Sequence, residues 1–155
     1  MRKSENKKRS QAETSFFCSH CGKEVDCQNL IGTKNRNHCP FCLWSKHVDT
    51  GISGDRASLC HSDMAPIALT FKREGTDKYG YEKQGEIMLV HQCQKCGLIR
   101  INRLAGDDDS RMVLALLKDS KNLNQKSKSE LNRQEITPLG EKDEREIKKQ
   151  LFGAI

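Results

Sequence analysis

The chain has few aromatic residues, few prolines and no long apolar segment. Only 5% of its 155 residues are aromatic, three are proline and 35% are apolar. A core made from so little apolar material is small, and small domains commonly need a covalent or metal cross-link to be stable. No run of about 18 apolar residues is present, so we expect no membrane-spanning helix and no membrane partner.

The N-terminal residues also lack the pattern of a secretory signal. Residues 1–9 are mostly basic or polar, and no apolar stretch follows them. We therefore expect a cytoplasmic protein. Thiols stay reduced in the cytosol, so the eight cysteines are expected to bind metal or do redox chemistry rather than form disulfides.

Six of the eight cysteines form three Cys-x-x-Cys pairs. The pairs are Cys18 and Cys21, Cys39 and Cys42, and Cys93 and Cys96. Seventeen residues separate the first pair from the second, which is the spacing of a zinc ribbon. We expect these first two pairs to hold one zinc ion tetrahedrally, which we call site A. Structural zinc is favoured over rubredoxin-type iron, and over redox dithiols because no thioredoxin-like βαβ pattern accompanies the pairs.

The third pair and Cys60 supply three thiolates for a second zinc ion, site B, and leave its fourth ligand open. The candidates for that ligand are His47, His61, His91 and Cys27. We favour His47 because Asp49 is near enough in the sequence to hold its second ring nitrogen. His91 is the runner-up, because it lies two residues before Cys93 on the same strand face. A water in place of a fourth side chain would make the zinc catalytic.

The apolar pattern predicts a small α+β fold, zinc-ribbon-like, with a three-stranded antiparallel meander over residues 65–103, zinc knuckles and short C-terminal helices. A knuckle is a tight turn that presents two thiolates. Helices are expected over residues 112–118 and 141–152. Phe41 and Trp44 are expected in the core rather than as platforms for base stacking.

Composition divides the chain into four parts. We expect a basic disordered arm at residues 1–14, a zinc-binding domain at 15–118, a flexible linker at 119–140 and a charged C-terminal helix at 141–155. The arm carries five basic and two acidic residues. Residues 15–105 carry a formal +3, which falls to zero if seven thiolates hold two Zn²⁺. Nucleic-acid binding would therefore depend on the arm or on a clustered patch.

Several short strings resemble the RNHCP-domain family of small bacterial proteins over residues 15–118. The strings are Cys18-x2-Cys21, Arg36-Asn37-His38-Cys39-Pro40, Cys42-Leu43, His47-Val48-Asp49, Gly54-Asp55-Arg56, Cys60, Met64-x-Pro66, Cys93-x2-Cys96-Gly97, Asn102-Arg103 and Ala105-Gly106-Asp107-Asp108. The resemblance implies a cysteine-rich, zinc-binding module and no particular activity. The polar residues in these strings either form a site or satisfy backbone amides of a loop-rich fold.

Three functions compete. The first is binding of RNA or association with the ribosome, through the basic arm and four arginines: Arg36, Arg56, Arg100 and Arg103. The second is a protein-interaction adaptor that docks its C-terminal helix on a partner. The third is a zinc-dependent hydrolytic enzyme with an open position at site B.

Overall fold

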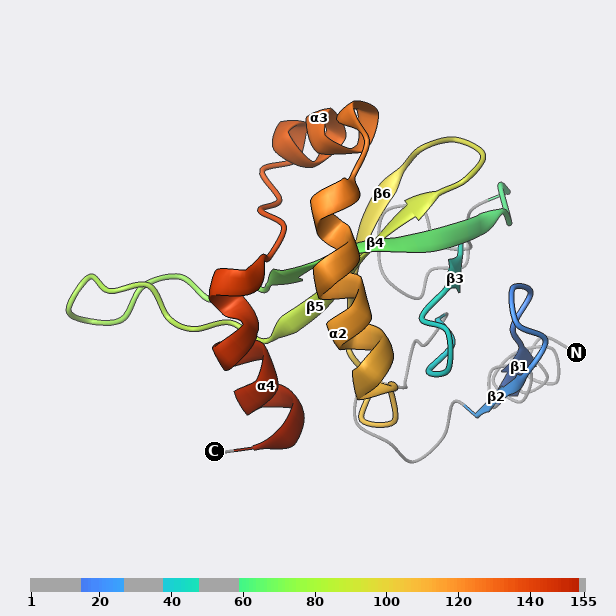
Figure 1. Ribbon diagram of the computed structural model, residues 1–155. Coiled ribbons are helices and arrows are strands. Elements are labelled where there is room, and N and C mark those ends of the chain that lie inside the picture. The colour runs from blue at the N-terminus through green and yellow to red at the C-terminus, as the bar shows by residue number, and fades with distance from the viewer. Residues whose placement is uncertain (1–14, 27–37, 48–58, 154–155) are drawn as a thin grey trace, which may run out of the picture.

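The structure is a computed structural model that describes residues 15–26, 38–47 and 59–153 (Figure 1). Its elements, in chain order, are β1 (Ser15–Phe17), β2 (Glu24–Asp26), β3 (Ser45–Lys46), β4 (Asp63–Phe71), β5 (Ile87–Cys93), β6 (Ile99–Arg103), α2 (Ser110–Asp119), the 3-10 turn η1 (Ser120–Asn122), α3 (Gln125–Arg133), the 3-10 turn η2 (Glu141–Asp143) and α4 (Glu144–Phe152). The small α+β class with short C-terminal helices is confirmed. None of the helices in these ranges has the length and apolar character needed to cross a bilayer.

The main sheet has four strands in the order β3-β4-β5-β6, and every pairing is antiparallel. The predicted meander corresponds to β4, β5 and β6, but the prediction of three strands is wrong because β3 adds a fourth at the edge. Strand β3 is only two polar residues long, Ser45 and Lys46, so it carries no apolar alternation that a sequence pattern could reveal. It is held through backbone pairing with Met64 and Asp63.

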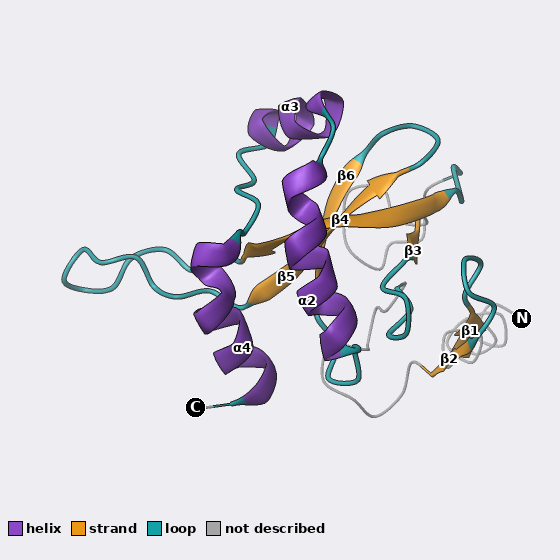
Figure 2. Cartoon of the chain, viewed as in Figure 1, coloured by secondary structure: helices purple, strands orange, loops and turns teal. Residues whose placement is uncertain are grey.

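Strand β5 is buried on both faces of this sheet because adjacent residues of a strand point in opposite directions. Leu89 belongs to the larger core, which α2 and α4 cover on one face. Val90 belongs to a smaller cluster with Ala68 and Ile99, and Leu131 of α3 covers it on the other face. Figure 2 shows α2 and α4 side by side against the sheet.

The segment 119–140 differs from the flexible linker that composition suggests. It contains helix α3, whose first turn is capped where Asn124 Oδ1 accepts a hydrogen bond from the Ser127 amide at 2.7 Å. Leu131 is 1% exposed, and Leu123 and Ile136 pack beside it. These three apolar residues are too widely spaced among polar ones to give a helical pattern, and tertiary burial stabilises the helix instead. The domain boundaries themselves stay predictions.

Helix α4 is docked on the core of its own chain. Ile147 is fully buried in the cluster that contains Leu89. The Gln150 side chain accepts a hydrogen bond from the Ile87 amide at 2.8 Å and donates one to the Gly85 carbonyl at 2.9 Å. The helix therefore uses its apolar face, and one amide side chain, inside the molecule.

The connection between β4 and β5 projects from the sheet as a long hairpin (Figure 1). Asp77 Oδ1 accepts hydrogen bonds from the amides of Tyr79 and Tyr81, which shapes its tip. Both tyrosines are 73% exposed. At its base Gly85 leaves no room for a side chain, since a Cβ there would lie 1.7 Å from the Lys72 carbonyl oxygen.

Candidate metal centres

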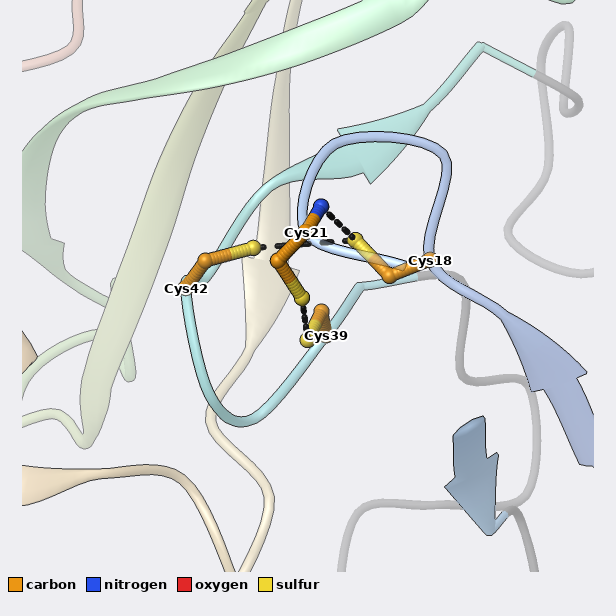
Figure 3. Close-up of side chains that lie close together, drawn as sticks. All are labelled: Cys18, Cys21, Cys39 and Cys42. Carbon is orange, nitrogen blue, oxygen red and sulfur yellow. Dashed lines mark hydrogen bonds between the residues drawn. The ribbon is translucent and has the colours of Figure 1, made fainter. Parts of the chain in front are cut away.

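Site A consists of the four thiols of the first two pairs, which two facing turns bring together (Figure 3). The sulfurs of Cys18 and Cys42 are 3.6 Å apart, and so are those of Cys21 and Cys39. A disulfide bond would bring two sulfurs to about 2.05 Å. A tetrahedral ion with metal–sulfur bonds of about 2.3 Å separates its sulfur ligands by about 3.8 Å. The observed spacing fits a shared metal ion and excludes a disulfide.

The same turn occurs three times, once in each Cys-x-x-Cys pair. The amide of the residue after each pair donates to the carbonyl of its first cysteine: Gly22 to Cys18 at 2.8 Å, Leu43 to Cys39 at 2.8 Å and Gly97 to Cys93 at 3.0 Å. All three of these residues have positive φ, at 78°, 66° and 77°. Glycine adopts this conformation without strain, whereas leucine is strained in it. Leu43 holds it while its side chain is 1% exposed in the main core.

Backbone amides in site A point at the sulfurs. The amides of His20 and Cys21 each lie 3.4 Å from Cys18 Sγ, and the Phe41 amide lies 3.4 Å from Cys39 Sγ. Such bonds stabilise negative charge on sulfur, which a metal-bound thiolate carries. The turns therefore position their thiols and supply amide hydrogen bonds that a metal-bound thiolate accepts.

Site B gathers His47, Cys60, Cys93 and Cys96, whose ligand atoms all lie within 4.8 Å of one another. The sulfurs of Cys60 and Cys93 are 3.6 Å apart, and His47 Nδ1 is 3.5 Å from Cys96 Sγ. Zinc bonds of about 2.3 Å to sulfur and 2.0–2.1 Å to nitrogen place S and N ligands about 3.6 Å apart in a tetrahedron. This donor set of three sulfurs and one nitrogen therefore fits a second tetrahedral ion.

His47 reaches site B because β3 continues beside the start of β4. Its amide donates to the Ser62 carbonyl at 2.9 Å, and its carbonyl accepts from the His61 amide at 3.0 Å. The other described candidates for the fourth ligand do not join the cluster. His61 lies just before β4, with φ of 53°. The His91 ring is hydrogen-bonded to the Leu43 carbonyl instead. Cys27 and Asp49 lie outside the described residues.

In each site the pKa of one thiol is lowered and the pKa of at least one other is raised. Burial raises the pKa of Cys42 well above its ordinary value, and burial also raises the pKa of Cys39. Burial also acts to raise the pKa of Cys93. Hydrogen bonds from the backbone amides of Cys96 and Lys95 outweigh this effect and lower the pKa to about 6. Several thiolates so close together repel one another, so a bound cation is needed to keep all of them ionised.

A buried polar network joins the second turn to the sheet and to the loop before α2. His38 Nε2 donates to both oxygens of Asp108 at 2.9 Å, and each side chain is 2% exposed. Asp108 Oδ2 also accepts from the Ala105 amide at 2.8 Å. His91, fully buried, has Nε2 at 2.6 Å from the Leu43 carbonyl and Nδ1 at 2.7 Å from the Asn102 side-chain nitrogen.

These distances set the state of the His91 ring. A carbonyl only accepts, so Nε2 of His91 donates its hydrogen to Leu43 and Nδ1 accepts from Asn102. Burial lowers the pKa of His91 to about 3, which agrees with a neutral ring. The sequence identifies His38, Asn102 and Asp108 only as polar residues of the RNHCP-like strings and leaves their roles open. Their partners lie 70 and 11 residues away, so no local pattern identifies them.

Of the four arginines proposed for nucleic acid, the structure describes two, and these two do not lie on the same face of the sheet. Arg36 and Arg56 lie outside the described residues. Arg100 and Arg103 are three positions apart on β6, so they point to opposite faces of the sheet. Arg103 also forms an ion pair with Glu86, with Nε of the arginine 3.5 Å from Oε2 of the glutamate.

The placement of Phe41 in the core is wrong, because its side chain is 45% exposed. The cysteines at the two ends of its turn, Cys39 and Cys42, belong to the site A cluster, and Phe41 belongs to none of the hydrophobic clusters of the described chain. Trp44 is half-buried, and its ring stacks on His20 rather than inside a hydrophobic cluster. No sequence pattern distinguishes a turn aromatic that points outward from one that packs inward.

Each of the two clusters could hold one metal ion, and together they contain seven cysteines and one histidine. No curated protein and no solved structure matches this chain. A family model does match residues 13–114, which are most of the chain and include both clusters and the buried network. The chain therefore belongs to the RNHCP domain family.

Proposed function

We propose that the protein is a binding module held together by two structural zinc ions, and that its ligand is RNA, free or in the ribosome. The observation that carries the proposal is the donor set: four side chains at tetrahedral spacing in each site. Sulfur-rich sites with one or no histidine are typical of structural zinc. Four protein donors leave no coordination position for a reactive water, which speaks against the hydrolytic alternative.

Redox chemistry at the Cys-x-x-Cys pairs has little support. Thioredoxin-like dithiols belong to folds with parallel strands, whereas all strand pairings in the described chain are antiparallel. The spacing of the sulfurs also fits metal ligation rather than a dithiol that closes to a disulfide.

The adaptor alternative loses its main argument because α4 is used internally. Its buried Ile147 and the hydrogen bonds of Gln150 hold it on the core, so the apolar face that would dock in a groove is already occupied, and of its large apolar residues Phe152 is exposed. The argument for RNA binding remains the five basic residues of the N-terminal arm, residues 1–14.

The test has two parts. Metal analysis of the purified protein should find two zinc ions per chain. Fluorescence anisotropy should then show binding to a labelled single-stranded RNA at low salt, weakened steeply by added salt and by replacing the five basic arm residues with glutamine. RNA binding that is unchanged by the arm substitutions and by salt, or no binding at low salt, would refute the RNA part.

A further inference from the structure

Side chains of the first two metal-binding turns pair with each other on the surface of site A. The His20 ring stacks on the Trp44 ring with centroids 3.9 Å apart and planes 6° from parallel. Lys23 Nζ lies 4.7 Å from the centroid of the Phe41 ring. In each pair the first turn supplies a polar or cationic group and the second turn supplies the aromatic ring. We call these four residues the aromatic edge.

The aromatic edge is accessible to solvent, although three of its four side chains are rings. His20, Lys23 and Phe41 are all exposed, and Trp44 is half-buried. The cluster beneath it consists of Cys18, Val25 and Cys39, packed against Phe16 and Cys42, and it does not include Phe41 or Trp44. The rings therefore do little for the core, while the two turns that carry them are fixed by the ligands of site A.

We propose that the aromatic edge stacks the unpaired bases of single-stranded RNA; this rests on the RNA-binding function proposed above. One face of the His20 ring lies on Trp44, and a base can extend that stack on the other face. Phe41 offers a second ring. Every nucleobase has a π-face, so two rings on the two turns that share site A bind single strands with little sequence preference. Duplex RNA keeps its base faces stacked and does not fit.

Charge also favours a polyanion over an apolar partner. Lys23 places a cation directly at the Phe41 ring, where a phosphate beside a stacked base can reach it. The five basic residues of the arm, the last of which is Arg9, precede this edge in the sequence and add to the positive charge of the chain. A single strand that stacks on the rings would have Lys23 available for one of its phosphates.

The experiment uses the full-length, zinc-loaded protein and an unstructured single-stranded RNA of mixed sequence. Trp44 is the one tryptophan of the chain, so its fluorescence reports on the aromatic edge alone. We expect the RNA to quench this fluorescence to saturation, and a duplex of the same sequence to quench it much less. Phe41→Ala should weaken binding about 5- to 150-fold, the range found for loss of one base stack.

Two further variants separate stacking from charge and from general effects of substitution. Lys23→Gln should lower the slope of log affinity against log salt by about 0.7, the value for one phosphate contact on a single strand. Tyr79→Ala is the matched control, because Tyr79 is a more exposed aromatic on the distant hairpin and should leave affinity unchanged. Zinc content and circular dichroism confirm that each variant is folded.

The outcomes separate this inference from the function on which it rests. If anisotropy shows RNA binding but Trp44 fluorescence does not change and Phe41→Ala binds like wild type, RNA binding stands and the aromatic edge is not its site. Equal binding of duplex and single strand would also overturn the inference. If removal of the arm changes Trp44 fluorescence without RNA, the arm itself occupies the edge and the inference fails. No RNA binding at all would refute both.

Discussion

Leu43 offers the sharpest test of the idea that one turn geometry is used three times. It occupies the position of Gly22 and Gly97 and has φ of 66°, which a leucine adopts at a cost of about 1–2 kcal/mol. Its side chain is 1% exposed in the main core, and a buried leucine contributes about 2–5 kcal/mol relative to alanine. Burial therefore outweighs strain.

Two substitutions at Leu43 measure these two effects. Leu43→Ala loses the burial but keeps the strain, so we expect it to lower the free energy of unfolding by about 2–5 kcal/mol. Leu43→Gly also loses the burial but relieves the strain, while it gives the unfolded chain about 0.4–1 kcal/mol of extra entropy. Leu43→Gly should thus be more stable than Leu43→Ala by up to about 1.6 kcal/mol, the reverse of the usual order of the two residues.

The control is Gly22→Ala, which introduces the same strain on the surface. A Cβ at Gly22 would meet nothing within 4 Å, so only backbone strain is added. The difference between alanine and glycine should be the same at both positions. Urea unfolding at one buffered concentration of free zinc measures all three variants. If Leu43→Gly is neutral, or if Leu43→Ala is the more stable of the two, this account of the turn is wrong.

Three other substitutions follow from the structure. Asp108→Ala should destabilise by about 2 kcal/mol or more in urea unfolding, because it leaves His38 Nε2 and the Ala105 amide without their buried acceptor; a loss under 1 kcal/mol would contradict this role. Gly85→Ala should cost about 1–3 kcal/mol in the same assay, since its Cβ would overlap the Lys72 carbonyl, whereas Gly140→Ala, with open space around it, should change little. His47→Ala should change the absorption spectrum of the cobalt-substituted protein at one of two sites, and an unaltered spectrum would remove His47 from the ligands.

Site A could be predicted from the sequence because its ligands come in local pairs with a short loop between them. The spacing of Cys18, Cys21, Cys39 and Cys42 specifies two turns, and a tetrahedral ion needs nothing more. Strand β1, Ser15–Phe17, leads into the first of these turns, which Gly22 closes with its positive φ.

Only some of the site B ligands could be predicted from the sequence. Cys60, Cys93 and Cys96 could be assigned, but the choice among the histidines depended on strand pairing. His47 is brought to the site by β3, which is too short to have a sequence pattern. His91 has a suitable position in the sequence, yet its ring is held by the Leu43 carbonyl and by Asn102.

The remaining misses share one physical cause, which is contact between residues far apart in the chain. The polar segment that contains Leu131 forms a helix because Leu131 is buried against Ala68 and Val90. His38 and Asp108 are both polar, so the sequence gives no reason to expect them in the interior, where the fold buries them together. Phe41 reads as core because it is apolar, although the turn that carries it is fixed by metal ligands rather than by packing.

The most direct test of the account is the zinc content of the purified protein together with the X-ray absorption spectrum at the zinc edge. Two sites with seven sulfur ligands and one nitrogen predict two zinc ions per chain, each surrounded on average by 3.5 sulfurs at about 2.3 Å and 0.5 nitrogen at about 2.0–2.1 Å. A folded chain without metal, or a spectrum with a substantial oxygen shell from bound water, would contradict it.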